Sequence, residues 1–145
     1  MAQTNILLEA GTNELEVVEF YLDEAVPDQT DVAADRPADA PPPPDRYRGY
    51  YGVNVAKVLE IIRMPKVTEL PEVQHPSVLG AFNLRSRIIP LVDLAMWLGK
   101  THPASEDQPK TIVTEFNNVT TAFMVSGVNR IHRISWERVE PPNKY

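Results

Sequence analysis

The sequence contains no cysteine, which excludes disulfide bridges and thiolate metal sites. Glycine is also scarce, with 6 residues among 145, and neither a glycine-rich phosphate-binding motif nor a G-x-S-x-G nucleophile motif occurs. No apolar run approaches the roughly 20 residues that a helix needs to cross a bilayer. The first residues lack the basic region and the long apolar stretch of a secretory signal. We therefore expect a cytoplasmic protein without direct membrane insertion.

The formal net charge of -6 is unevenly distributed along the chain. Residues 1–46 hold 11 acidic and 2 basic side chains, a balance of -9, whereas residues 47–145 hold 9 acidic and 12 basic side chains, a balance of +3. Binding to nucleic acid normally requires clustered basic residues with stacking aromatic residues between them. The second part is only mildly basic, so we expect no nucleic-acid partner.

The clearest change in composition lies at residues 24–48, EAVPDQTDVAADRPADAPPPPDRYR. Alanine, aspartate and proline dominate this stretch, and it has no apolar periodicity, which predicts a disordered insertion. The four prolines at 41–44 favour an extended polyproline conformation, which could serve either as a solvated spacer or as a ligand of an SH3 or WW domain. Because the entropy cost of closing a loop grows slowly with its length, such an insertion is tolerable between two paired strands.

The rest of the pattern is typical of β structure. Residues 14–22 and 50–55 are rich in β-branched and aromatic residues with nearly alternating polarity, and we expect them to pair across the insertion. Further strands are predicted at residues 67–70, 78–84, 87–92, 112–116, 121–125 and 128–134. Helix is predicted only near residues 4–9, as a turn at 56–59, and at 94–98, where Gly99 stops it. Many short strands indicate a mainly β fold, a small barrel or sandwich.

The stretch NLRSRIIPLVDLAMWLGK at residues 83–100 joins a predicted hairpin to the last short helix. Pro90 cannot donate a ladder hydrogen bond and indicates an edge or a bulge, and Asp93 is placed to cap the helix that follows. We expect Trp97 and its neighbour Leu98 to pack back onto the barrel. Arg85, at the hairpin turn, is either a solvated side chain or an interface residue, since a planar guanidinium can bind carboxylates bidentately.

Nothing in the sequence indicates catalysis. His75, His102 and His132 lie far apart, and none has metal-ligand spacing to another histidine or to a carboxylate pair. Ser126 and the glycine after it lie between the predicted strands 121–125 and 128–134 and are interpreted as a strand bend. We therefore expect no enzyme activity, no metal and no cofactor. A small-ligand-binding β-barrel is the alternative class.

Three segments together resemble a known family. They are YYGVNVAKVLEIIRMPKVTELP, HPSVLGAFNLRSRIIPLVDLAMWLG and TIVTEFNNVTTAFMVSGVNRIHRI. In this order they are similar to the CheW-like domain of bacterial chemotaxis, and most closely to the N-terminal coupling domain of CheV proteins. The resemblance covers about residues 12–140 apart from the insertion.

The resemblance implies a single CheW-like domain over residues 1–145, built from two interlocked five-stranded SH3-like barrels with short helices and a hydrophobic groove between them. It implies a non-enzymatic scaffold for signal transduction. Such an adaptor links the cytoplasmic tips of methyl-accepting chemoreceptors to the regulatory domain of the CheA histidine kinase, in the cytoplasm and in association with membrane-bound receptor arrays.

The family's coupling surface falls on a small set of positions. By resemblance, the partner-binding residues here are Val58, Glu60, Gly80, Asn83, Arg85 and Ser86. We expect Arg85 to be the polar anchor and Val58 to contribute to an apolar patch. The residues alone leave alternatives open: Val58 could be packed in the core, and Glu60 could be an exposed charge of little energetic consequence.

The chain departs from the family pattern at two places besides the insertion. Ser86 occupies a turn position where the family usually has glycine, so the tip is either strained or uses another turn type. The sequence stops before the family's final strand pair and closing helix, and nothing resembles a receiver domain. We expect a barrel that is incomplete at this end, with open strand edges that favour homo-oligomers.

Overall fold

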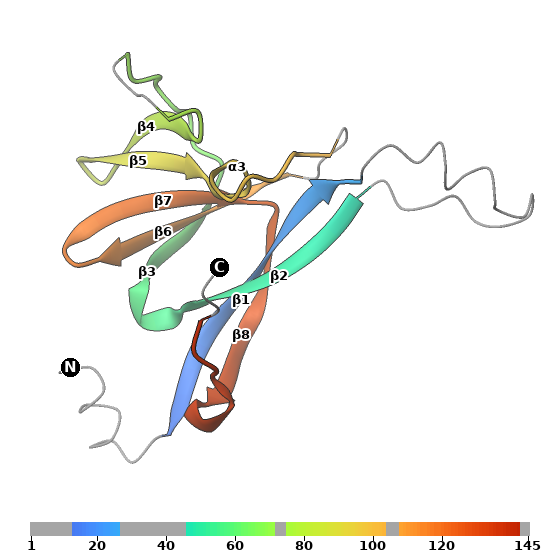
Figure 1. The fold of residues 1–145 in the computed structure, drawn as a ribbon. Helices are drawn as coiled ribbons and strands as arrows, with labels where there is room; N and C mark the ends of the chain where they lie inside the picture. Colours follow the sequence, from blue (N-terminus) through green and yellow to red (C-terminus); the bar gives the residue numbers. More distant parts are fainter. Residues whose placement is uncertain (1–12, 27–45, 72–74, 104–107, 143–145) are drawn as a thin grey trace, which may run out of the picture.

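The computed structural model describes residues 13–26, 46–71, 75–103 and 108–142. Its elements are β1 (Glu14–Ala25), β2 (Arg46–Asn54), η1 (Val55–Lys57), β3 (Val58–Arg63), β4 (Val78–Leu84), β5 (Arg87–Asp93), α3 (Leu94–Trp97), β6 (Lys110–Phe116), β7 (Val119–Val125), β8 (Gly127–Ser135) and η2 (Trp136–Arg138). They form a three-stranded sheet of order β2-β1-β8 and a five-stranded sheet of order β3-β6-β7-β5-β4 (Figure 1). The predicted mainly β class is confirmed.

The five-stranded sheet curves until its two edge strands are connected through the segment that follows β3. Thr68 in that segment bridges Ala81 of β4, with the two N–H···O bonds measuring 2.8 and 2.9 Å. Because side chains alternate along each strand, one face of the sheet collects its own core. That core consists of Phe82, Ile89, Leu91, Val113 and Ala122. The sheet therefore has its own hydrophobic interior, as a small barrel requires.

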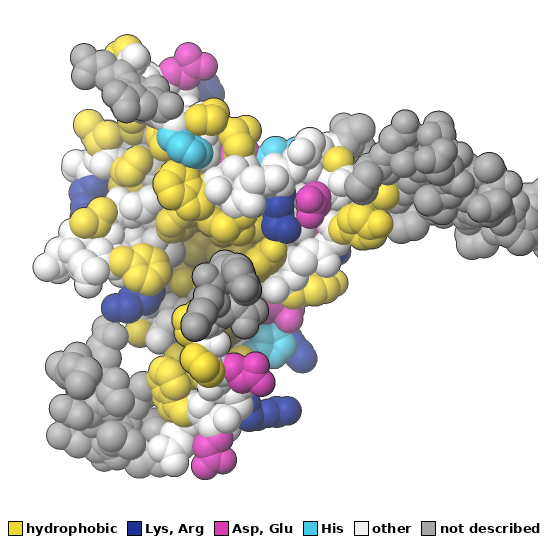
Figure 2. Space-filling view, viewed as in Figure 1, with side chains coloured by type: hydrophobic (Ala, Val, Ile, Leu, Met, Phe, Trp, Pro, Cys, Tyr) yellow, Lys and Arg dark blue, Asp and Glu magenta, His cyan; other side chains and the backbone are white. Residues whose placement is uncertain are grey.

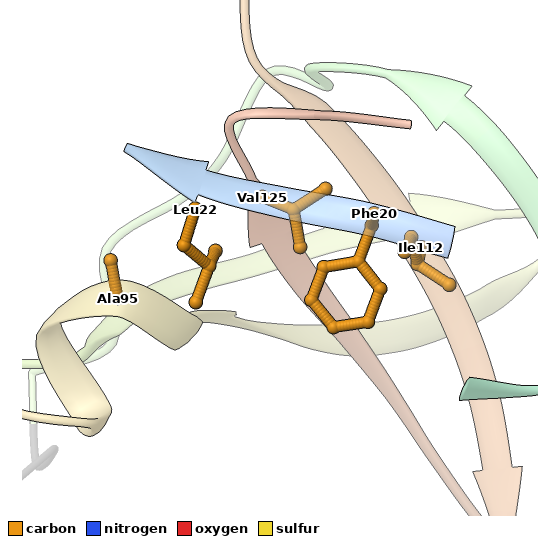
Figure 3. Close-up of a cluster of buried hydrophobic side chains, with 5 residues drawn as sticks. All are labelled: Phe20, Leu22, Ala95, Ile112 and Val125. Atoms are coloured by element: carbon orange, nitrogen blue, oxygen red, sulfur yellow. The ribbon is translucent and has the colours of Figure 1, made fainter. Parts of the chain in front are cut away.

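A second core joins the two sheets. Phe20 and Leu22 of β1 meet Ala95 of α3, Ile112 of β6 and Val125 of β7 (Figure 3). These side chains are almost completely buried, and burying one large apolar side chain stabilises a fold by about 1.5–3 kcal/mol. The three-stranded sheet thus packs against the face of β6 and β7 that carries Ile112 and Val125, and the two sheets form one body.

The predicted pairing across the insertion is confirmed. β1 and β2 are antiparallel and stay in register from the pair Val17 and Asn54 to the pair Ala25 and Arg46. The strands therefore extend at both ends into the range predicted as insertion, so residues 24–25 and 46–48 belong to the sheet. The remainder of that range, residues 27–45, and the predicted helix at 4–9 lie outside the described residues.

Two predicted boundaries were wrong. The helical turn expected at 56–59 is a shorter 3-10 turn over Val55–Lys57, and Val58 already begins β3, a strand that the sequence analysis missed. The strand expected at 67–70 is a single bridge at Thr68, since prolines on both sides prevent a longer ladder. The two predicted hairpin turns, at Arg85 and at Asn117, are confirmed by strands that end and begin on either side of them.

The short helix is capped as predicted, but its end is not buried. The Asp93 side chain accepts a hydrogen bond from Met96 N–H at 3.2 Å. Trp97 and Leu98 are each about half exposed, so the expectation that they pack onto the barrel was wrong. Pro90 has no N–H to donate. It lies one residue before Leu91, where the parallel pairing of β5 with β7 begins, so the missing donor does not interrupt that pairing.

The expected pair of five-stranded barrels differs from the structure in its strand count. Among the described residues one sheet has five strands and the other has three. In the three-stranded sheet β2 and β8 are the outer strands, so each offers one unpaired side within the described part of the chain.

Candidate functional site

The β4–β5 hairpin presents the residue chosen as the polar anchor. Arg85 and Ser86 form the turn, with φ values of 51° and 67°. Two consecutive left-handed residues are the pattern of a type I′ turn, whose twist matches that of a β-hairpin. For residues other than glycine this conformation costs roughly 1 kcal/mol each. The hairpin therefore adopts a turn type in which glycine is usual, although serine occupies the position, and its tip is strained.

Two of the predicted partner-binding residues contact each other directly. The Arg85 guanidinium lies 3.4 Å from Glu60 Oε2 and 3.5 Å from Oε1. Glu60 belongs to β3 and Arg85 follows β4, so this ion pair connects the two edge strands of the five-stranded sheet. The Arg85 side chain is 79% exposed, and an exposed ion pair contributes at most about 1 kcal/mol to stability. The contact thus orients the Arg85 side chain rather than holding the fold together.

Gly80 has a structural reason to be glycine. Its φ is 144°, and an added Cβ would lie 2.3 Å from the carbonyl oxygen of Thr68 and 2.6 Å from Val67 Cγ1. The residue sits at a register shift in the β4–β5 pairing, under the segment that connects the sheet edges. Gly80 is buried, so the glycine keeps this segment close to β4 and offers no exposed side chain of its own.

The remaining predicted residues are divided between core and surface. Val58 is partly buried and packs against the core between the sheets, which favours the alternative considered for it. Asn83 is exposed on β4 and pairs across the hairpin with Ile88. The structure therefore brings Glu60 and Arg85 together and places Asn83 and Ser86 on the same hairpin. Val58 and Gly80 lie beneath.

The sequence analysis missed how the two hairpins are connected. The Arg87 guanidinium donates a hydrogen bond to Thr120 Oγ1 at 2.8 Å, from the β4–β5 hairpin to the β6–β7 hairpin. Next to it, Ile88 is 79% exposed. Its position was visible in the alternation along β5, in which Ile89 and Leu91 point inward and Ile88 therefore points outward.

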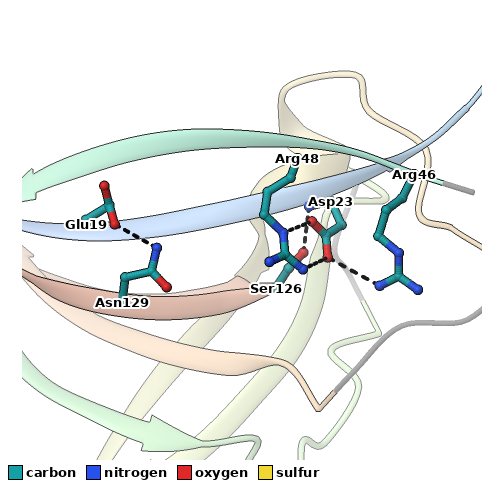
Figure 4. Close-up of polar contacts among 6 residues, drawn as sticks. All are labelled: Glu19, Asp23, Arg46, Arg48, Ser126 and Asn129. Atoms are coloured by element: carbon teal, nitrogen blue, oxygen red, sulfur yellow. Dashed lines mark hydrogen bonds and ion pairs between the residues drawn. The ribbon is translucent and has the colours of Figure 1, made fainter. Parts of the chain in front are cut away.

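A polar cluster of Asp23, Arg46, Arg48 and Ser126 lies on the outer side of the three-stranded sheet (Figure 4). The buried Asp23 carboxylate accepts hydrogen bonds from Arg48 at 2.8 and 3.1 Å, and Arg46 lies 3.5 Å away. The backbone N–H of Asp23 donates to Ser126 Oγ at 2.8 Å. The hydrogen bond and the charge of Asp23 raise the pKa of Arg48. These bonds supply the partners that a buried carboxylate needs.

A second polar group surrounds the start of α3. Besides capping the helix, Asp93 lies 2.6 Å from His102 Nε2 and donates its backbone N–H to the Ser77 carbonyl at 2.7 Å. His75 Nδ1 lies 2.6 Å from Ser77 Oγ, and the His75 ring lies 4.7 Å from the Trp97 ring. His102 and His75 therefore contact residues that fix the helix, while His132 pairs with Glu19 at 3.2 Å in the other sheet.

Within the described part of the chain, no group of three or more histidine, aspartate or glutamate side chains is arranged to hold a metal ion. In the same residues, no helix is both long enough and apolar enough to span a membrane. The arrangement is that of a two-sheet body with an exposed charged hairpin.

Comparison with known proteins identifies relatives of this arrangement. A family model described as the CheW-like domain matches residues 46–145. Chemotaxis protein CheV3 of Helicobacter pylori is 52% identical over 96 residues, which cover 66% of this chain and 30% of that protein. Chemotaxis protein CheW of the same organism is 26% identical over 91 residues, covering 63% of this chain and 54% of that protein. The chain thus spans about a third to a half of the length of these curated relatives.

The fold is also found in a solved structure. The scaffolding protein TtCheW from Thermoanaerobacter tengcongensis superposes with a TM-score of 0.67 at 22% sequence identity, covering 90% of this chain and 73% of that protein. At this level of identity the likeness concerns the fold.

Proposed function

The chain belongs to the CheW-like domain family, and from this membership we propose that it is a non-enzymatic adaptor of bacterial chemotaxis. Its proposed partners are the cytoplasmic tips of methyl-accepting chemoreceptors and the regulatory domain of the CheA histidine kinase. The proposed location is the cytoplasm, next to membrane-bound receptor arrays. The family match over residues 46–145 and the identity to a CheV protein support this proposal.

The observation that carries the proposal in the structure is the exposed Arg85, held by Glu60 at the tip of a strained hairpin. An arginine at an interface can make bidentate bonds to a partner's carboxylate, and arginine is enriched among residues that dominate binding energy. Because Glu60 lies 3.4 Å away and is itself partly buried, the guanidinium is oriented before a partner arrives. Such preorganisation lowers the entropy cost of association.

An adaptor requires a rigid body and surfaces, not reacting groups. The core between the sheets joins β1 to β6, β7 and α3, so a partner bound to one sheet has a fixed orientation relative to a partner bound to the other. We propose Glu60, Asn83, Arg85 and Ser86 as the contact residues. Val58 and Gly80 act by shaping the surface from beneath.

Calorimetric titration into the isolated regulatory domain of a CheA kinase tests this function. Arg85→Ala should weaken binding at least tenfold, since an interface arginine that loses its partner typically costs more than about 1.4 kcal/mol. Arg133→Ala is the matched control, because Arg133 is also an exposed arginine, 72% accessible, that faces a single carboxylate. Saturable binding that both variants weaken equally, or no binding by a chain shown to be folded by circular dichroism, would contradict the proposal.

We further propose that the chain forms homo-oligomers through the outer strands of the three-stranded sheet. β2 and β8 each have one side without a neighbour among the described strands, and such edges pair readily with another strand. Sedimentation velocity over a hundredfold range of protein concentration tests this proposal. A sedimentation coefficient that stays at the monomer value throughout would refute it.

A further inference from the structure

The two outer strands of the three-stranded sheet differ in where their charges lie. β2 and β8 stand at the two ends of the order β2-β1-β8, so each is paired on one side among the described strands. Neither strand contains an acidic residue, and each contains two arginines. A free charge on an edge strand hinders pairing with a further strand. The surroundings of these arginines therefore decide which edge is open to a partner.

Both arginines of β2 are bound by the sheet itself. Arg48 donates to the buried Asp23 carboxylate at 2.8 and 3.1 Å, and Arg46 reaches the same carboxylate at 3.5 Å (Figure 4). The Arg48 guanidinium also lies 3.9 Å from the centre of the Tyr21 ring. Because Asp23 and Tyr21 belong to β1, both arginine side chains lean toward the paired side of β2 and away from its open side.

The arginines of β8 stay at the surface. Arg133 is 72% exposed, with Glu16 at 3.8 Å, and Arg130 is also exposed. If two copies of β8 paired antiparallel over their full length, Arg130 would lie diagonally across from Arg130 of the second copy. Side chains in diagonal positions are within reach of each other, and like charges there disfavour pairing. β8 therefore carries the charges that protect an edge strand, whereas β2 does not.

The side chains that β2 exposes most are aromatic. Tyr50 is 61% exposed and Tyr47 is 56% exposed. Figure 2 shows hydrophobic side chains at the surface where β2 begins, at the right of the view. Tyr50 lies beside Tyr21 of β1, with the two ring centres 6.4 Å apart. Aromatic and β-branched side chains on neighbouring strands stabilise a sheet, so this edge offers favourable contacts to a further strand.

From this contrast we infer that β2 pairs with β2 of a second copy, antiparallel and about a two-fold axis at Tyr50. Tyr50 is the middle residue of Arg46–Asn54, so this register uses the whole strand. It sets Tyr50 against Tyr50 of the second copy and Tyr47 against its Val53. No arginine then lies opposite or diagonal to another arginine. The inference rests on the proposed homo-oligomer and deepens it by naming the strand, the symmetry and the register.

The alternative contact joins β2 of one copy to β8 of the next. It brings the basic residues of two strands that have no acidic residue onto one ladder. It also leaves a free β2 at one end and a free β8 at the other, so that copies add without closing. A two-fold contact uses the same strand of both copies and ends at the dimer.

Disulfide trapping tests the strand and the register, because the chain has no cysteine of its own. Tyr50→Cys should form a covalent dimer in a glutathione redox buffer. Residues that face each other across antiparallel strands have Cα atoms about 4.5–5.5 Å apart, which suits a disulfide. Tyr47→Cys is the control for the register, since its two copies would lie about 20 Å apart along the strands. It should give at least tenfold less covalent dimer.

Ile131→Cys is the control for the strand. Ile131 is the middle residue of Gly127–Ser135 and is 58% exposed, close to the exposure of Tyr50. It should also give at least tenfold less covalent dimer than Tyr50→Cys.

Lysine at the same two positions tests the contact without any covalent bond. Tyr50→Lys sets two lysines face to face at the axis and should weaken self-association at least tenfold in sedimentation equilibrium. Ile131→Lys should change it less than twofold. Both side chains are exposed, so both variants should fold, which circular dichroism checks.

The outcomes separate this inference from the homo-oligomer on which it rests. Self-association with trapping mainly at Ile131→Cys, or only between mixed Tyr50→Cys and Ile131→Cys chains, would keep the homo-oligomer and overturn the assignment to β2. Equal effects of the two lysine variants would do the same, and efficient trapping at Tyr47→Cys would overturn the register. A folded chain that stays monomeric at every concentration and gives no trapped dimer would overturn both proposals.

Discussion

Replacing Gly80 with alanine should be one of the most damaging single-methyl changes in this chain. The added Cβ would lie 2.3 Å from the Thr68 carbonyl oxygen, a backbone atom that cannot rotate away, and 2.6 Å from a methyl group of Val67. The φ of 144° is also a conformation that alanine rarely adopts. Backbone strain of this kind costs about 1–3 kcal/mol, and overpacking adds about 1–3 kcal/mol. We expect a total loss of about 3–5 kcal/mol in the free energy of unfolding.

Urea denaturation of Gly80→Ala and Gly99→Ala, followed by circular dichroism, measures this loss. Gly99 has a φ of 80°, but an added Cβ would meet nothing within 4 Å. Its replacement should therefore cost only the backbone term, about 1 kcal/mol. The difference between the two variants isolates the contact with the segment at Thr68. If both variants lost the same free energy, the closure of the sheet through that segment would not be as described.

Three further predictions concern the polar contacts and the hairpin tip. Arg48→Ala should lower the free energy of unfolding by about 2 kcal/mol, because it removes the closest partner of the buried Asp23 carboxylate while Arg46 remains; an unchanged urea midpoint would show that solvent replaces that partner. Hydrogen bonds to Tyr51 and then to Glu24 raise the pKa of Lys100 above 10.5, so the stability that charged Lys100 contributes is complete below that pH and is lost as the pH rises through the folded-state pKa. The unfolding free energy of Lys100→Met should therefore fall less steeply with pH in this alkaline range, and a slope identical to that of the unchanged chain would refute the role of Lys100. Ser86→Gly should stabilise the chain by about 0.5 kcal/mol, since relief of the left-handed strain exceeds the extra entropy of glycine in the unfolded state; a lower thermal midpoint would contradict the turn type.

Local signals predicted most of the strands and both hairpins. Asn117 and Asn118 tolerate left-handed backbone, and the structure shows φ values of 50° and 65° there. Asp93 before an apolar tetrapeptide predicted a helix cap, which is present. These features depend on residues within a few positions of each other, so propensity and alternation were enough to find them.

The missed features depend on tertiary context. The start of β3 was predicted as part of a helical turn at 56–59, whereas pairing of Val58 with Thr114 of β6 makes it a strand. Trp97 was expected to pack back onto the barrel, but the helix directs Ala95 into the core and leaves Trp97 about half exposed.

Contacts between distant residues were also beyond the sequence. Arg85 and Glu60 are 25 positions apart, and Asp23 and Ser126 are 103 positions apart. The resemblance to a family placed Glu60 and Arg85 on one surface, but only the structure shows that they contact each other. The parallel pairing of β5 with β7 is likewise a contact that no local pattern in either strand indicates.

The polar cluster at the end of β1 has a consequence for how this domain can change over time. Ala25 and Arg46 remain paired, with Asp23 bonded to both arginines of β2, and Ala25 N–H donates to the Thr101 carbonyl at 2.7 Å. Paired strands keep their Cα atoms about 5 Å apart. Whatever sequence connects positions 26 and 46 must therefore leave and re-enter the sheet at two neighbouring points that the pairing holds fixed. Lengthening, shortening or rewriting that connection leaves the register of the sheet untouched. Selection is therefore free to vary the sequence there independently of the body that carries the hairpins.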